Sequence, residues 1–245
     1  MTAEEVRLIP LFLEIIGEPS VGKTHLASLF PKPALLDTTT KGESYSVFSK
    51  LHSDWKRRYF RIRCLEDVRI TLKYIKQNKE DFKTVVFDTS ADLREMGSKE
   101  YLAELNKQGK ERQTLMPQEY RWVNEKINGF IDEVTDVEKG LGMNLVFTSQ
   151  MRDEWREGKS TGRRIRKGYP DANFQSDIRL FLQLTQKVDE KTMQLIPNEF
   201  ERKCQVIKNR FRDQANKEDW KAELKELNWT GIVELARLKE GQIVE

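Results

Sequence analysis

A phosphate-binding motif near the start of the chain limits the possible folds more than any other feature. Residues 17–24 read Gly-Glu-Pro-Ser-Val-Gly-Lys-Thr, which matches the pattern G-x-x-x-x-G-K-[S/T]. The glycines let the backbone curl so that successive N–H groups point at a polyphosphate, at the positive end of the following helix. An apolar run at 11–16 supplies the strand before the motif, and residues 23–30 can form the helix after it. The sequence therefore predicts a strand–loop–helix unit that binds a nucleotide.

The motif also predicts which side chains hold the ligand, expected to be ATP with Mg²⁺. Lys23 would reach the β- and γ-phosphates, and the Thr24 hydroxyl would hold the metal. Asp88 follows the apolar run 84–87 and is placed for the Walker B role, in which a carboxylate holds the water shell of Mg²⁺. An Asp that only caps the turn after a strand is the alternative. The residues expected at the nucleotide are Gly17, Glu18, Pro19, Ser20, Val21, Gly22, Lys23, Thr24 and His25.

Strands alternate with helices over the first 150 residues. Further strands are expected at 34–37, 59–64, 84–88 and 144–148, and helices at 66–78 and 118–137. This alternation predicts an α/β fold with a mostly parallel central sheet and helices on both faces. Residues 151–176 are polar and contain glycine, which predicts a loop. Runs at 178–185 and 203–211 then predict two strands without a helix between them, so the sheet should finish antiparallel.

The end of the chain is expected to be a helical tail. We place the core at residues 1–213 and the tail at 214–245, with a charged helix from Lys217 and a shorter helix to about Lys239. Six apolar residues of the tail are expected to pack on the core or on a neighbouring subunit: Trp220, Leu224, Leu227, Trp229, Ile232 and Leu235.

Composition excludes several classes of protein. The chain has 245 residues, a formal charge of +3, two cysteines and two histidines. Cys64 and Cys204 lie far apart without a metal-binding motif, so neither a disulfide framework nor a cysteine zinc site is expected. His25 and His52 leave little material for a histidine metal site or a Ser-His-Asp triad. The apolar runs are too short for a membrane span, and no membrane partner is expected.

Together the motifs resemble the RecA-like ATPases, and most closely the compact phage-type P-loop proteins grouped with single-strand-annealing recombinases. Besides the P-loop and Asp88, three segments carry the resemblance over residues 11 to about 212: 146–152 (Val-Phe-Thr-Ser-Gln-Met-Arg), the basic stretch after it, and 206–210 (Val-Ile-Lys-Asn-Arg). The resemblance implies a RecA-like core in which Gln150 senses the γ-phosphate. It also implies a homo-oligomer with ATP at the subunit interfaces, where Lys208 and Arg210 reach into the site of the next subunit.

The chain departs from the family pattern at the catalytic base. In this family the strand after the P-loop helix usually ends in Asp-x-Glu, whose Glu orients the attacking water. Here Asp37-Thr38-Thr39 puts Thr39 at that place. Glu43 is the candidate replacement, and a solvated loop glutamate is the alternative. Slow hydrolysis, or binding without turnover, is therefore an open expectation.

A basic segment follows Gln150, at the place of the family's second DNA-binding loop. Cations that follow phosphates, with aromatic side chains that stack on bases, are typical of single-strand binding, and Trp155, Tyr169 and Phe174 lie in this region. A solvated flexible loop is the alternative. The stretch 94–118 is a second candidate by its order in the chain, or else a solvated helix. The cations expected to bind DNA are Arg152, Arg156, Lys159, Arg163, Arg164, Arg166 and Lys167.

We therefore expect a DNA-dependent ATPase that binds single-stranded DNA as an oligomer and promotes strand annealing or recombination. A single-strand-binding protein is a further partner that this role would allow, and the cytoplasm of a prokaryotic or phage-infected cell is the expected location. Three alternatives stay open: a nucleotide-gated DNA-binding protein with little hydrolysis, an AAA+-type helicase loader, and a small P-loop kinase. Thr89 after Asp88, and the short stretch after the last strand, argue against the loader.

Overall fold

A central sheet organises the protein, whose computed structural model describes residues 9–156, 158–188, 195–211 and 227–236. Its strands run in the order β3-β2-β4-β5-β1-β7-β8, and β6 pairs with β5 outside this path. Five pairings are parallel, and those of β5 with β6 and of β7 with β8 are antiparallel. The expected mostly parallel α/β fold with an antiparallel end is confirmed. The strands are β1 (Phe12–Gly17), β2 (Pro33–Asp37), β3 (Tyr59–Arg61), β4 (Thr84–Asp88), β5 (Asn144–Arg156), β6 (Lys159–Lys167), β7 (Ile178–Val188) and β8 (Leu195–Asn209).

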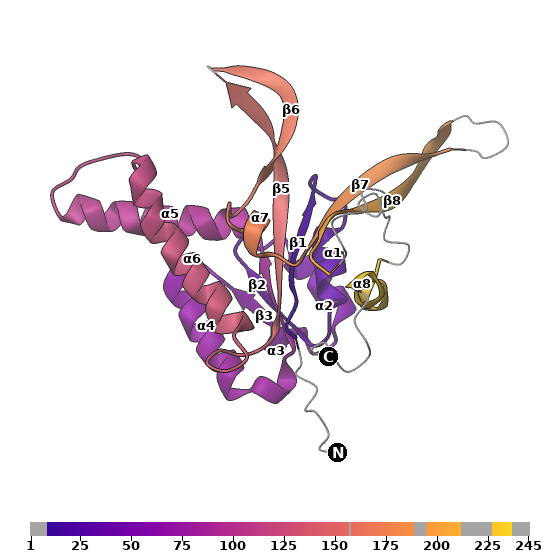
Figure 1. The fold of residues 1–245 in the computed structure, drawn as a ribbon, viewed down its shortest axis with the longest axis horizontal. Coiled ribbons are helices and arrows are strands. Elements are labelled where there is room, and N and C mark those ends of the chain that lie inside the picture. Colours follow the sequence, from indigo (N-terminus) through magenta and orange to yellow (C-terminus); the bar gives the residue numbers. More distant parts are fainter. Residues whose placement is uncertain (1–8, 157, 189–194, 212–226, 237–245) are drawn as a thin grey trace.

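Three long helices cover one face of the sheet (Figure 1). In the first of them Leu65, Val68, Leu72 and Ile75 are all buried, at the spacing that puts apolar residues on one side of a helix. They pack with sheet residues such as Val85 into one hydrophobic core. These helices are α4 (Leu65–Gln77), α5 (Ser90–Lys107) and α6 (Tyr120–Thr135); the one-turn helix η1 (Lys79–Asp81) follows α4, and η2 (Pro117–Glu119) precedes α6.

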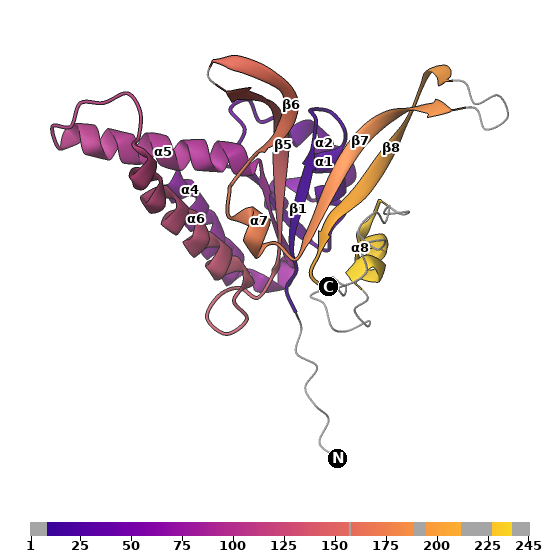
Figure 2. The same ribbon diagram turned by 45° about the horizontal axis from the view of Figure 1, so that its top comes forward.

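Shorter helices cover the opposite face and build a second core. Leu26, Phe48 and Ile232 contribute to it from three different helices, against sheet residues such as Ile15 and Leu180. Figure 2 shows the last of these helices beside β7 and β8. The elements are α1 (Lys23–Ser28), α2 (Tyr45–Leu51), α3 (Trp55–Arg58) and α8 (Trp229–Ala236), while the single turn α7 (Ala172–Gln175) precedes β7. None of the helices in the described residues has the length and hydrophobicity needed to cross a membrane.

The prediction of a polar loop at 151–176 is wrong for most of that stretch. Strand β5 continues beyond the sheet to Arg156, and β6 returns antiparallel to it, so the two form a projecting hairpin (Figure 1). Burial along β5 falls from complete at Asn144 to exposed at Arg156. A strand that packs on nothing needs no apolar alternation, so this segment lacks the pattern by which strands are recognised.

Other elements differ from expectation at their ends. The strand expected at 59–64 stops at Arg61, and the one expected from 203 already begins at Leu195. In the tail, Leu227, Trp229 and Ile232 pack on the second core as expected. Trp220, Leu224, the helix expected from Lys217 and the expected core–tail boundary lie outside the described residues, as does the side chain of Leu235.

Candidate functional site: a P-loop with a converging carboxylate

The P-loop leaves the carboxyl end of β1 at Gly17 and enters α1 at Lys23. Ser20 and Gly22 have left-handed backbone, with φ of 64° and 102°. Gly17 is required for packing, because a Cβ there would lie 2.6 Å from the Leu182 carbonyl oxygen of β7. The backbone thus forms the curled loop that the motif predicts, at the positive end of α1.

Lys23 lies inside this curl. Its ammonium is buried and donates to the carbonyl oxygens of Gly17, at 3.0 Å, and Glu18, at 2.7 Å. Burial lowers the pKa of Lys23 below its ordinary value, although the charges of Asp88 and Glu18 oppose the shift. Two neutral carbonyls compensate a buried cation poorly, so an anionic ligand at this place would gain a strong charge-assisted partner.

Asp88 ends β4 and accepts three hydroxyl hydrogen bonds. Thr24 of the P-loop donates to Asp88 Oδ2 at 2.6 Å, Ser44 donates to the same oxygen at 2.7 Å, and Thr148 of β5 donates to Oδ1. The side chain is buried. The carboxylate therefore faces the P-loop, although β4 and β1 are separated in the sheet by β5.

These residues fit ATP with Mg²⁺. Oxygen donors are the ligands that Mg²⁺ prefers, and the metal is bound in NTPases through few protein groups plus phosphates and water. The Thr24 hydroxyl and the Asp88 carboxylate provide two oxygens within 3 Å of each other, at the start of the phosphate-binding helix. Mg²⁺ would supply charge neutralisation between the phosphates, while Lys23 and the loop N–H groups hold and orient the polyphosphate. Among the other nucleotide-binding candidates, Pro19, Ser20 and His25 are exposed, and Val21 is buried.

Thr39 holds a turn together and carries no acid for water activation. Its hydroxyl donates to Asp37 Oδ1 at 2.6 Å and accepts from the backbone N–H groups of Gly42 and Glu43. Asp37 is fully buried and also accepts from the Tyr59 hydroxyl. Burial and the bond to Asp37 raise the pKa of Tyr59 to about 12, so this phenol is a fixed donor. Glu43 is exposed, and its carboxylate has no hydrogen-bond or ion-pair partner among the described residues.

Gln150 lies next to the P-loop at the point where β5 leaves the sheet. It stands opposite Gly17 in the parallel β1–β5 register and opposite Lys167 in the antiparallel β5–β6 register. The residue expected to sense the γ-phosphate is therefore continuous with the basic hairpin.

Two arginines that sequence reasoning did not place at the nucleotide contact the P-loop. Arg164 of β6 forms a bidentate ion pair with Glu18, at 2.9 and 2.5 Å, and also pairs with Asp153. Arg202 of β8 donates to the Val21 carbonyl oxygen at 3.2 Å, and its Nε would lie 3.1 Å from a Cβ at Gly22. Both contacts join segments far apart in the chain, and no local motif indicates them.

The seven cations of the hairpin have different environments. Arg156 pairs with Glu154, and Arg166 pairs with Glu14. Within the part of the chain that the structure describes, Arg152, Lys159, Arg163 and Lys167 form no ion pair. Trp155, beside them, is 65% exposed. The hairpin therefore presents unpaired positive charge and an exposed indole to solvent.

A buried glutamate in β1 is a further feature that sequence reasoning missed. Glu14 is fully buried and pairs with Arg166 and with Arg179, the latter at 2.9 Å, and it accepts from the Ser149 hydroxyl at 2.6 Å. A glutamate in the middle of an apolar strand is the signal that could have indicated such a partner network. Glu14 links β1 to the base of the hairpin and to the start of β7.

Lys208 and Arg210 lie away from the P-loop of their own chain. Lys208 stands opposite Arg179, which itself stands opposite Glu14, toward the amino end of β1. Its ammonium donates to the carbonyl oxygens of Asn173, Phe174 and Ser176. Arg210 pairs with Asp177 at 3.0 Å, and its side chain is 51% exposed. Within one chain these residues connect β8 to α7, and action on a neighbouring subunit stays a prediction.

The site defines the class of protein. The site combines a P-loop after an inner strand of the sheet, a lysine within that loop and a carboxylate that converges on the P-loop threonine. These are the parts of a P-loop ATPase domain. A model of the family described as AAA domain matches residues 10–220, and the chain belongs to this family.

Comparison with solved structures finds a similarity to a KaiC-like protein of the hyperthermophilic archaeon Pyrococcus horikoshii OT3. The TM-score is 0.45 at 15% sequence identity, over 82% of this chain and 79% of the other. No curated protein matches the sequence.

Proposed function

We propose that this protein is an ATPase that binds single-stranded DNA through the β5–β6 hairpin, as an oligomer, and supports strand annealing or recombination. One observation carries the proposal: the strand that runs past the P-loop continues as a basic hairpin, whose Arg164 pairs with Glu18 of the P-loop. The P-loop is thus joined to the hairpin by an ion pair, and Gln150 beside the P-loop lies on a strand of the hairpin. ATP binding would change the position of Gln150 and of Glu18, and so bias the hairpin toward its DNA-binding state.

The surface of the hairpin supports a nucleic-acid ligand. Unpaired cations attract phosphates at any sequence, and an exposed aromatic ring offers a stacking platform for an unpaired base. Trp155 is 65% exposed. A large exposed ring beside free cations suits a single strand better than a duplex, whose bases are already stacked.

The direct test measures ATP hydrolysis with and without single-stranded DNA, together with binding of a labelled oligonucleotide with and without ATP at two salt concentrations. We expect hydrolysis stimulated by DNA, and binding that is strengthened by ATP and weakened by salt. If DNA changes neither hydrolysis nor nucleotide affinity, the DNA-binding part of the proposal is wrong. The P-loop is then better explained by the function of a helicase loader or of a small kinase.

Oligomerisation through the nucleotide site requires a separate test. In the proposal, Lys208 and Arg210 of one subunit act on ATP bound by its neighbour, and Arg210 is the more accessible of the two. Arg210→Ala should stop DNA-stimulated hydrolysis, and so should Lys23→Ala. A mixture of the two variants should recover part of the activity, because one interface then combines an intact P-loop with an intact arginine. A mixture without activity would contradict action between subunits.

A second candidate, nucleotide-gated DNA binding with little hydrolysis, is favoured by the geometry at Thr39. The hydroxyl at the expected position of the catalytic glutamate is committed to Asp37 and to a turn. Glu43 is then the remaining candidate base in this loop. If Glu43 activates water, Glu43→Gln should lower turnover by about a hundredfold without weakening ATP binding. The matched variant Glu66→Gln, at an exposed position of α4, should leave turnover unchanged. Equal and very low turnover in all three proteins would favour the nucleotide-gated binder.

A further inference from the structure

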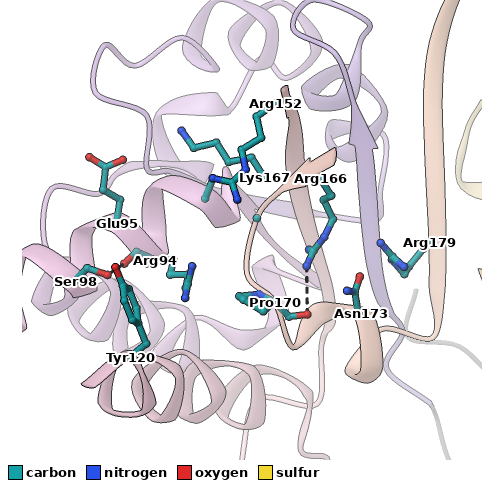
Figure 3. A pocket seen from close by; sticks show the side chains of 12 residues that line it. Arg94, Glu95, Ser98, Tyr120, Arg152, Arg166, Lys167, Pro170, Asn173 and Arg179 are labelled. Atoms are coloured by element: carbon teal, nitrogen blue, oxygen red, sulfur yellow. Dashed lines mark hydrogen bonds between the residues drawn. The ribbon is translucent and has the colours of Figure 1, made fainter. Parts of the chain in front are cut away.

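A pocket of about 590 Å³ lies at the base of the hairpin, apart from the P-loop. It is bounded by α5, by both hairpin strands and by the start of β7, and Figure 3 shows its cationic side chains around the same hollow. Five cationic side chains and one carboxylate line the pocket. The cations are Arg94, Arg152, Arg166, Lys167 and Arg179, and the carboxylate is that of Glu95. Few of the lining side chains are apolar: they are Ala91, Pro170 and the ring of Tyr120. Sites for apolar small molecules are lined predominantly by hydrophobic side chains, so this pocket suits a polar anion.

The cations differ in what already neutralises them. Arg166 and Arg179 share the buried carboxylate of Glu14, which fixes their guanidinium groups at the wall of the pocket. Arg152 and Lys167 have no ion-pair partner within the described residues. The carboxylate of Glu95 is paired with Lys99 at 2.6 Å, outside the pocket lining. Lys167 acts on the carboxylates of Asp92 and Glu95 through space, without an ion pair to either. The pocket therefore retains more positive than negative charge.

Arg94 adds a guanidinium that no carboxylate holds among the described residues. It lies over the ring of Tyr120, 4.7 Å from the ring centroid, and its Nε is buried without a hydrogen-bond partner among the described residues. A buried N–H without a partner is costly, so the surroundings of this guanidinium leave part of its hydrogen-bonding capacity unused. A guanidinium also presents several donors in a plane, which matches the oxygens of a phosphate.

We propose that this pocket is a second phosphate-binding site, which takes the backbone of a single nucleic-acid strand as it passes the base of the hairpin. The choice of ligand rests on the proposed function, since a free phosphate ester has the same chemistry. The site includes Arg94 and Arg179, which lie outside the basic hairpin. It also separates two roles within the hairpin, because Arg164 and Arg166 hold carboxylates while Arg152 and Lys167 stay available to a ligand.

The position of the pocket relates it to the nucleotide site. Helix α5 begins directly after Asp88 and Thr89, and the Thr89 hydroxyl caps its first turn by accepting from the backbone N–H of Asp92. Ser90, the first residue of α5, contacts Ser149, which stands next to Gln150 and bonds to Glu14. The chain thus continues from Asp88, at the end of β4, and from Gln150 of β5 into walls of the pocket.

The test compares three double variants that each remove two positive charges. The pocket variant is Arg152→Gln with Lys167→Gln, whose side chains leave no carboxylate unpaired. Lys159→Gln with Arg163→Gln alters the far end of the hairpin. Lys73→Gln with Lys76→Gln alters the exposed side of α4 and serves as the control. Binding of a labelled oligothymidylate, with ATP and Mg²⁺ present, is measured by anisotropy over a range of salt concentrations.

We expect the pocket variant to bind the oligonucleotide at least about tenfold more weakly than wild type, since each lost charged contact is worth about that factor. The slope of log affinity against log salt should fall by about 1.4, the value for two phosphate contacts on a single strand. The control variant should bind as wild type. If the hairpin-end variant loses affinity while the pocket variant keeps its affinity and slope, the pocket proposal is overturned and the proposed function stands.

A wild-type protein that binds no oligonucleotide would instead remove the nucleic-acid ligand and the DNA part of the proposed function. The phosphate site is then decided by calorimetry with inorganic pyrophosphate in a Lys23→Ala background, where the P-loop is impaired. If the pocket substitutions abolish pyrophosphate binding in the Lys23→Ala protein and the control substitutions do not, the pocket is a site for free phosphate esters. No binding, or binding unaffected by the pocket variant, overturns the site altogether.

Discussion

Lys23 and Asp88 show how single side chains prepare the site. Asp88 accepts three hydroxyl hydrogen bonds, from the P-loop, from the turn before α2 and from β5. Its position is therefore fixed from three sides before any metal binds, which limits the reorganisation that binding requires. Lys23 is held by two backbone carbonyls and needs only to exchange them for phosphate oxygens. Both residues are thus close to the positions in which they would act.

The lowered pKa of Lys23 gives a testable dependence on pH. Burial favours the neutral amine, so Lys23 in the nucleotide-free protein loses its proton at a lower pH than an exposed lysine. A bound polyphosphate favours the ammonium and raises the pKa again. ATP affinity should therefore be insensitive to this group below the lowered pKa, and should fall by up to about tenfold per pH unit above it. Titration of a fluorescent ATP analogue from neutral to alkaline pH measures this fall.

The variant Lys23→Arg is the control for that titration, because a guanidinium keeps its charge throughout the range. Its affinity at neutral pH is expected to be lower, since the longer side chain fits the loop less well, but the alkaline fall should disappear. A fall of the same size in Lys23→Arg would assign the pH dependence to another group.

Elements with a regular apolar face were predictable from the sequence. Helix α5, whose buried Leu93 and Leu105 form no such regular face, and the exposed strand β6 were not. Helix α4 was predicted nearly in full because Val68, Leu72 and Ile75 repeat at helical spacing over a buried face. Strand β6 has exposed or half-buried residues throughout, and its sequence predicts a loop. The contacts of Arg164 and Arg202 with the P-loop depend on how β6 and β8 pair with their neighbours. Strand register in this region is a property of the assembled sheet, and no local pattern in the sequence encodes it.

The ion pair between Glu18 and Arg164 should couple the hairpin to the nucleotide. Both side chains are largely exposed, so Arg164→Gln and Glu18→Gln should leave the midpoint of thermal unfolding nearly unchanged. The ratio of DNA affinities with and without ATP should fall in each single variant. If the two residues act as a pair, the double variant should change that ratio no further than either single variant does. Independent, additive changes would show that the pair does not transmit the nucleotide state.

Gly168 places the segment after β6 against the sheet, and its replacement tests this packing. A Cβ there would overlap with the Ser149 hydroxyl and lie 2.9 Å from that of Ser90, so it would push Ser149 away from Glu14. We expect Gly168→Ala to lower the free energy of unfolding by about 1–3 kcal/mol. The control Gly129→Ala lies on α6, where a Cβ meets nothing within 4 Å. It should raise stability by about 0.5–1 kcal/mol, because alanine favours the helix. Denaturant unfolding distinguishes the two, and an equal gain from both would contradict the close packing at Gly168.

At the scale of the whole molecule, the sheet is covered by helices that are distant in the chain. The P-loop helix α1 and the late helix α8 contribute to one core, and Phe30, two residues after α1, has its ring centroid 5.1 Å from that of Trp229 at the start of α8. Ile232 is fully buried in the same core as Leu26 of α1. The end of the chain therefore stabilises the helix on which the phosphates of the nucleotide would be bound.

This arrangement predicts that a substitution in the core-facing side of α8 lowers the stability of the entire domain. Ile232→Ala should lower the free energy of unfolding by about 2–4 kcal/mol, the usual cost of a cavity in a packed core. Unfolding should stay a single transition, because Ile232 belongs to the core that also holds α1. Val233→Ala, at a partly buried position of the same helix, should cost less. Bound ATP analogue should raise the unfolding midpoint of both variants, since binding to the folded state alone adds stability by mass action. A separate early transition in Ile232→Ala, with the nucleotide-dependent transition unmoved, would show instead that α8 unfolds independently of the nucleotide-binding core.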